Sequence, residues 1–126
     1  TCVCTNRFLV QDAVYDTFSQ KLAARVRELK VGNGRDTGVA LGPLIDASAK
    51  NKVQEHVDDA ARQGARVLTG GRPHALGALF YEPTVLADVT PHMLVAREET
   101  FGPVAPLFRF RDEAHAIALA NDTEFG

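Results

Sequence analysis

The sequence predicts an α/β fold with a largely parallel open sheet and flanking helices. Two observations support this class: short apolar runs alternate with segments of helical periodicity, and no internal repeat or low-complexity tract interrupts them. Strands and helices that alternate at this pace are typical of βαβ units, whose strands run parallel. The 126 residues give room for one domain with a hydrophobic core.

The first predicted strand comprises residues 7–10, and a helix follows it with Asp12 as its N-cap. The apolar residues of this helix keep spacings of four and three, which predicts one core-facing stripe. The stripe consists of Val14, Phe18, Leu22, Val26 and Leu29. Glycines at positions 32, 34 and 38 then end the helix.

The second predicted helix has Asp46 as its N-cap and Gly64 as its C′ residue. Its core-facing stripe consists of Ala49, Val53, Val57 and Ala60. His56 lies on the flank of the same helix, beside Glu55, which predicts a solvated position.

The second half of the chain is predicted to supply most of the sheet. A turn is expected at residues 70–73, and Pro83 favours the edge or the start of a strand. A last helix should run from Asp112 to about Asn121. The remaining predicted strands are residues 65–69, 81–89 and 104–110.

Composition excludes several classes of partner. The hydrophobic fraction of 45% and the charged fraction of 24% are ordinary for a soluble globular protein. A net charge of −2, spread along the chain, gives no field that attracts a polyanion, so no nucleic-acid partner is expected. No apolar run approaches the roughly 20 residues that cross a bilayer, so no membrane is expected either. Two cysteines are too few for a disulfide scaffold, which favours a reducing, cytoplasmic compartment.

The two cysteines, Cys2 and Cys4, are one residue apart at the beginning of the sequence. A cysteine is a nucleophile where backbone donors or a helix N-terminus stabilise its thiolate. The alternative is that both are small packing residues before a strand. No metal site is expected, because Cys-x-Cys needs further ligands and the histidines lack the paired spacing of zinc sites. Those histidines are His56, His74, His92 and His115.

Two other features bear on ligand binding. The glycines at 32, 34 and 38 are interpreted as a connector, since they follow a helix and do not match G-x-G-x-x-G. The pair Glu98 and Glu99 is either a surface pair or a binding element. Phe101-Gly102-Pro103 fixes the backbone beside it, because glycine allows close approach and proline restrains φ. A carboxylate in such a place suits holding a ligand hydroxyl.

Two segments resemble the aldehyde dehydrogenase superfamily. Thr1-Cys2-Val3-Cys4-Thr5-Asn6-Arg7 looks like its catalytic-cysteine segment, and residues 98–103 are similar to its cofactor-contacting E-E-x-F-G-P motif. The turn at residues 42–45 and the strand at 81–84 follow the family's order, so the resemblance covers the whole chain. The Cys-Val-Cys form, residues 101–107 and the ending at 121–126 are most similar to the succinate-semialdehyde dehydrogenases.

The resemblance implies NAD(P)-dependent oxidation of a small aldehyde, succinate semialdehyde, to its acid. Cys2 would attack the carbonyl to give a thiohemiacetal, hydride would pass to NADP or NAD, and water would hydrolyse the remaining thioester. Glu99 would accept hydrogen bonds from the nicotinamide ribose, and Phe101 would pack beside the ribose and the ring. Cys4 would lie near the substrate pocket, as a possible disulfide partner of Cys2, since in some relatives the second cysteine forms a reversible disulfide with the first.

The resemblance also implies that residues 1–126 are a fragment of the catalytic domain, inactive alone, which starts at the nucleophilic-cysteine segment. The cofactor domain, the general-base Glu and the oxyanion-stabilising Asn are expected outside this chain, in an enzyme that forms a homo-oligomer. Three alternatives stay open: an aldehyde dehydrogenase of other specificity, a non-catalytic αβ interaction module, and a thiol redox protein. The redox protein would use Cys2 and Cys4 directly, without the usual Cys-x-x-Cys arrangement.

Overall fold

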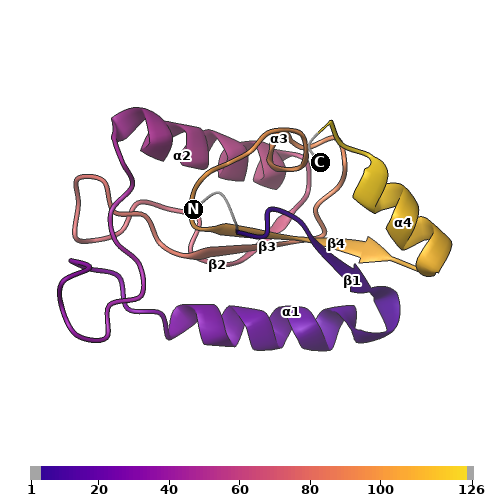
Figure 1. Cartoon of the computed structure of the whole chain (residues 1–126), viewed down its shortest axis with the longest axis horizontal. Helices are drawn as coiled ribbons and strands as arrows, with labels where there is room; N and C mark the ends of the chain where they lie inside the picture. Colours follow the sequence, from indigo (N-terminus) through magenta and orange to yellow (C-terminus); the bar gives the residue numbers. More distant parts are fainter. Residues whose placement is uncertain (1–3, 125–126) are drawn as a thin grey trace.

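The computed structural model of the chain describes residues 4–124, and a four-stranded sheet forms its centre (Figure 1). The strand order is β1-β4-β3-β2. β4 pairs in parallel with both β1 and β3, whereas β2 pairs antiparallel with β3. The predicted α/β class with a largely parallel sheet is therefore confirmed. The strands are β1 (Phe8–Gln11), β2 (Arg66–Thr69), β3 (Thr84–Ala87) and β4 (Val104–Phe110).

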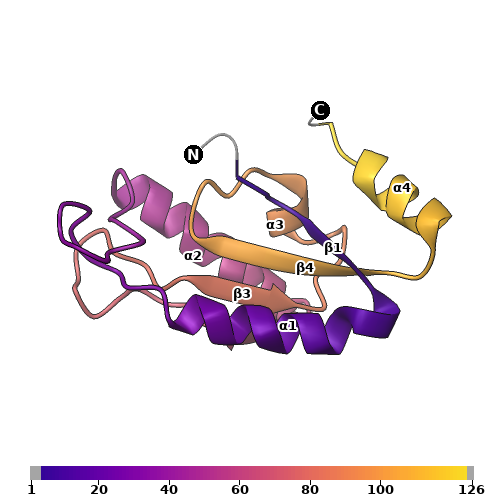
Figure 2. The same ribbon diagram turned by 60° about the horizontal axis from the view of Figure 1, so that its bottom comes forward.

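Helices cover both faces of the sheet. α1 lies against one face, and α2 with the short α3 lies against the other (Figure 2). α4 follows β4 at the β1 end of the sheet, where the Arg7 guanidinium donates to the carbonyls of Leu119 and Ala120 at 2.8 and 2.9 Å. The helices are α1 (Asp12–Arg27), α2 (Ala47–Arg62), α3 (Leu94–Arg97) and α4 (Glu113–Asn121). None in the described part of the chain is long and apolar enough to cross a membrane.

The helix ends follow their sequence signals except at α1. The Asp46 carboxylate accepts from the Ala49 amide at 2.7 Å, as predicted. Asp112, from which the last helix was predicted to start, is its N-cap and accepts from the His115 amide at 2.8 Å. Gly64 follows α2 with a φ of +102°, a conformation that suits glycine. At α1 the prediction is wrong by one residue: Gln11 is the N-cap and Asp12 is already helical.

The face of α1 that meets the sheet also differs from the prediction. Tyr15, Ser19 and Ala23 are buried, whereas Val14, Phe18 and Leu29 are exposed by 52%, 38% and 40%. Tyr15 explains the difference, because its hydroxyl donates to the Leu107 carbonyl at 3.0 Å and accepts from the Asp88 amide at 2.7 Å. These two bonds anchor the helix with position 15, not 14, toward the sheet. Leu22 and Val26 lie between the buried and the exposed face of α1 and are half-buried.

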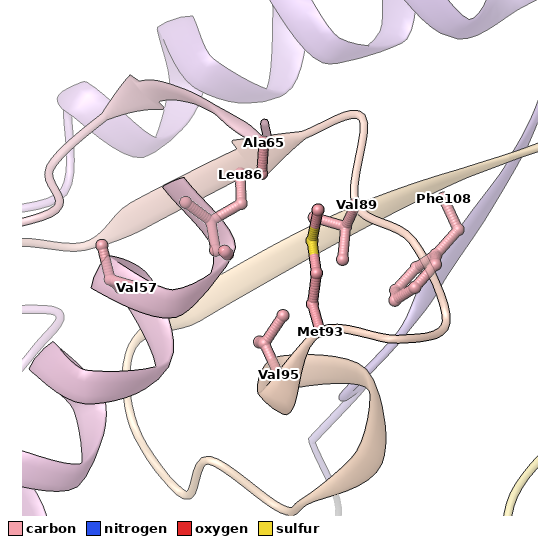
Figure 3. Packing of buried hydrophobic residues seen from close by; sticks show 8 residues of the cluster. Val57, Ala65, Leu86, Val89, Met93, Val95 and Phe108 are labelled. Carbon is pink, nitrogen blue, oxygen red and sulfur yellow. The ribbon is translucent and has the colours of Figure 1, made fainter. Parts of the chain in front are cut away.

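The core is divided by the sheet into two clusters, because successive residues of a strand point to opposite faces. Val85, Ala87 and Leu107 pack toward α1, with Tyr15. Leu86 and Phe108 point the other way, toward α2 and α3 (Figure 3). The stripe predicted for α2 is confirmed at Val53, Val57 and Ala60, which are buried, and Ala49 is half-buried. The second cluster consists of Val57, Ala60, Ala65, Leu86, Val89, Met93, Val95 and Phe108.

Candidate active site

The loop at residues 98–103, between α3 and β4, presents two of the predicted site residues. Glu99 is exposed and Phe101 is exposed by 51%, while Thr100 between them is buried. Phe101 has a φ of +51°, which is uncommon for a residue other than glycine. Such a conformation costs about 1–3 kcal/mol and persists only where its surroundings enforce it. The surroundings therefore fix the conformation of this loop, which directs the side chain of Phe101 outward.

Two neighbours hold the end of this loop. The Thr84 amide donates to the Pro103 carbonyl at 2.8 Å, which joins the loop to the start of β3. Gly102 lies so close to Val53 of α2 that a Cβ at this position would overlap the valine side chain. The predicted close approach of backbone at Gly102 is thus observed, and the element that approaches it is α2.

His56 of α2 lies behind the loop, and the prediction of a solvated position for it is wrong. Its side chain is 1% exposed. Nδ1 is 2.9 Å from Oγ1 of Thr100, and Nε2 is 3.5 Å from a carboxylate oxygen of Glu98. Burial lowers the pKa of His56, although Glu98 opposes this effect. The i, i+3, i+4 spacing with Val53 and Val57 was the available signal that position 56 is on the buried face.

The loop and the cysteine segment line one hollow of about 860 Å³. Cys4, Thr5 and Asn6 form part of its wall, and residues 99–103 form another part. Apolar side chains complete the wall, among them Phe8, Leu41 and Tyr81. Mostly apolar hollows with a few polar groups are the usual form of small-molecule sites. Two motifs that are about a hundred residues apart in sequence thus meet at one candidate site.

Cys4 is exposed in the wall of the hollow, but Cys2 lies outside the described residues. The roles of Cys2 as nucleophile and of Cys4 as its disulfide partner therefore stay predictions. Between residues 4 and 124, no three His, Cys, Asp or Glu side chains are arranged to hold a metal ion.

The sequence profile of the aldehyde dehydrogenase family matches residues 1–126, and the chain belongs to this family. It is 60% identical to glutarate-semialdehyde dehydrogenase of Pseudomonas aeruginosa over 126 residues, which are the whole chain and 26% of that protein. It is 58% identical to the NADP(+) succinate-semialdehyde dehydrogenase of Escherichia coli, again over the whole chain and 26% of the relative. The chain thus spans about a quarter of the length of these relatives.

Solved structures agree with this assignment. The succinate-semialdehyde dehydrogenase of Burkholderia pseudomallei superposes with a TM-score of 0.97 at 60% identity, covering 100% of this chain and 26% of that one. Betaine aldehyde dehydrogenase of Staphylococcus aureus, in complex with NAD+, superposes with a TM-score of 0.95 at 38% identity and the same coverage. The resemblance to the family that the two sequence motifs indicated is confirmed.

Proposed function

We propose that these residues act within an NAD(P)-dependent aldehyde dehydrogenase that oxidises a semialdehyde, such as succinate semialdehyde, to the corresponding acid. The observation that supports this most strongly is the shared hollow of about 860 Å³, which the cysteine segment and the 98–103 loop both line. The two relatives described above support the substrate class, since they are named for glutarate and succinate semialdehyde.

The residues of the loop fit a nicotinamide cofactor. The exposed carboxylate of Glu99 can accept hydrogen bonds from ribose hydroxyls, and the half-exposed ring of Phe101 can pack beside a flat heterocycle. The bound cofactor supplies the acceptor for a hydride. Glu99 and Phe101 then orient that acceptor toward the substrate, and a small misplacement of reacting atoms is costly in rate.

The chemistry proceeds on Cys2. Its thiolate attacks the aldehyde carbon to form a thiohemiacetal, which loses hydride from the same carbon and becomes a thioester. Water then adds to the thioester carbonyl, and the acid leaves as the Cys2 thiolate is restored. The general base for this water and the groups that stabilise the oxyanion belong, in our proposal, to parts of the protein outside these residues.

The complete protein is proposed to include a cofactor-binding domain, to form a homo-oligomer and to act in the cytoplasm. The length of the relatives supports the additional domain, since 126 residues match 26% of them. The small number of cysteines, two in the chain, supports a reducing compartment.

Replacing the nucleophile tests this function. In the complete protein, Cys2→Ser should abolish aldehyde oxidation and leave cofactor binding nearly intact, because an alcohol is far less ionised than a thiol at neutral pH. Cys4→Ser is the matched control, two residues away, and should retain most of the activity. Substantial oxidation by Cys2→Ser would refute the assignment.

A further inference from the structure

His56 connects α2 to the residue that separates the two proposed cofactor contacts. Its ring is buried and its Nδ1 is 2.9 Å from Oγ1 of Thr100, which is itself 7% exposed. Glu99 precedes Thr100 and Phe101 follows it, and both are exposed on the side of the hollow. Thr100, which also lines the hollow, is therefore held by α2 between two exposed neighbours.

The groups around the His56 ring determine which of its two nitrogens carries the proton. An ionised carboxylate accepts hydrogen bonds and cannot donate them, so Nε2, 3.5 Å from Glu98, carries the proton in neutral His56. Nδ1 then accepts a hydrogen bond from the Thr100 hydroxyl. The ammonium group of Lys52 also pairs with this carboxylate, with Nζ 3.8 Å from the Glu98 oxygen. The histidine thus offers Thr100 one acceptor of fixed direction.

Phe101 lies between two attachments of the loop to α2. Before it, Thr100 is bonded to His56; after it, Gly102 packs directly against Val53. His56 and Val53 are three residues apart and lie on one face of the helix. Phe101 has an unfavourable φ of +51° for its residue type, and these two attachments, together with the bond from the Thr84 amide to the Pro103 carbonyl, oppose relaxation of the loop.

We propose that His56 is a positioning residue, which holds Thr100 and thereby sets the directions of Glu99 and Phe101 toward the cofactor. The inference rests on the proposed function, since it assigns a support to the cofactor contacts of that function. His56 does not touch the cofactor or the substrate. Its effect should therefore be confined to cofactor affinity and hydride transfer, with the aldehyde KM unchanged.

The test compares variants of the complete protein that remove or keep one buried hydroxyl. Thr100→Val keeps the shape of the side chain and removes the bond to His56, and Thr100→Ser restores the hydroxyl. Tyr15→Phe is the matched control, because it removes another buried hydroxyl, on the α1 face of the sheet. These three variants and His56→Leu are measured for NADP+ affinity at equilibrium, for the burst of reduced cofactor and for thermal unfolding.

We expect Thr100→Val to weaken NADP+ binding and to slow the burst by about tenfold, as a small misplacement does. Thr100→Ser should recover most of both, and Tyr15→Phe should lower the unfolding temperature without changing either. His56→Leu should reproduce the effects of Thr100→Val. Wild-type affinity and burst rate in Thr100→Val, or equal losses in Tyr15→Phe, would overturn the proposal.

The equilibrium measurement separates this inference from the proposed function. A wild-type protein that binds NADP+ and oxidises no semialdehyde would contradict the function. The comparison of NADP+ affinity between Thr100→Val and Thr100→Ser would still decide whether His56 and Thr100 position the cofactor contacts.

Discussion

His56 and Thr100 are joined by a buried hydrogen bond of 2.9 Å, although 44 residues separate them in the sequence. The bond connects α2, which packs on the sheet, to the loop that presents Glu99 and Phe101 to the hollow. A helix that contributes no wall residue near Glu99 therefore determines how that loop is held.

Glu99→Gln should slow hydride transfer more than it weakens aldehyde binding. Glutamine keeps the shape of the side chain, but it removes the charge that strengthens hydrogen bonds from the ribose hydroxyls. The measurement is the pre-steady-state burst of reduced cofactor in the complete enzyme, with Glu113→Gln, an exposed glutamate on α4, as control. An unchanged burst rate in Glu99→Gln would show that this carboxylate does not orient the nicotinamide.

Gly102→Ala should disturb the loop by pushing it away from α2. The added Cβ would overlap Val53, and overpacking of this kind costs about 1–3 kcal/mol. We expect weaker cofactor binding and a lower unfolding temperature. The double variant Gly102→Ala/Val53→Ala makes room for the methyl group and should recover cofactor affinity relative to Gly102→Ala. If the double variant binds cofactor no better than the single one, contact with Val53 is not what positions the loop.

Acid should destabilise the protein through His56. Burial lowers the pKa of this histidine below its ordinary 6.5, with Glu98 opposing, so the unfolded chain binds the proton more tightly than the folded one. The stability is therefore complete above about pH 6.5 and decreases as the pH falls toward the lower folded pKa. His56→Gln should have a lower unfolding temperature at pH 7.5 and a smaller further decrease at acid pH.

The control for this pH dependence is His92→Gln, since His92 is an exposed histidine. Its unfolding temperature should follow the wild type at every pH. The role assigned to His56 is wrong if the difference between pH 7.5 and acid pH is the same in His56→Gln as in the wild type.

Mild peroxide should inactivate the complete enzyme reversibly through a Cys2–Cys4 disulfide. If this segment is extended, the two side chains project from one face with Cα atoms about 6.6 Å apart, near the upper limit for a disulfide. Such a strained bond is easily reduced. Mass spectrometry of residues 1–7 should show a loss of two hydrogens that dithiothreitol reverses. Sulfinic or sulfonic acid on Cys2 with an unmodified Cys4 would exclude the switch.

Local patterns predicted much of this fold. The strand at residues 104–110 has the same bounds in the structure. Asp46 caps the start of α2 and Gly64 follows its end, as their residue types indicate. Local patterns could not predict which residues of α1 face the sheet. Its orientation depends on the Tyr15 hydroxyl and its partners Asp88 and Leu107, which are more than 70 residues away.

The sequence motifs indicated residues that line the site, but they did not indicate His56, which contacts the loop from α2. Glu99 and Phe101 were identified from the resemblance of residues 98–103 to a family motif, and both are found exposed at the hollow. His56 was missed because a polar residue beside Glu55 indicates a solvent-exposed flank. Its burial is explained by Thr100, a partner that becomes visible only when the loop and α2 are placed together.

The central claim, that Cys2 is the nucleophile of this site, is tested most directly by trapping the thioester. The complete enzyme is mixed with NADP+ and succinate semialdehyde, quenched in acid during the burst and digested, and the peptide of residues 1–7 is sequenced by mass spectrometry. We predict a succinyl group on Cys2 and none on Cys4. A succinyl group on Cys4, or none on either cysteine while reduced cofactor accumulates, would contradict the account.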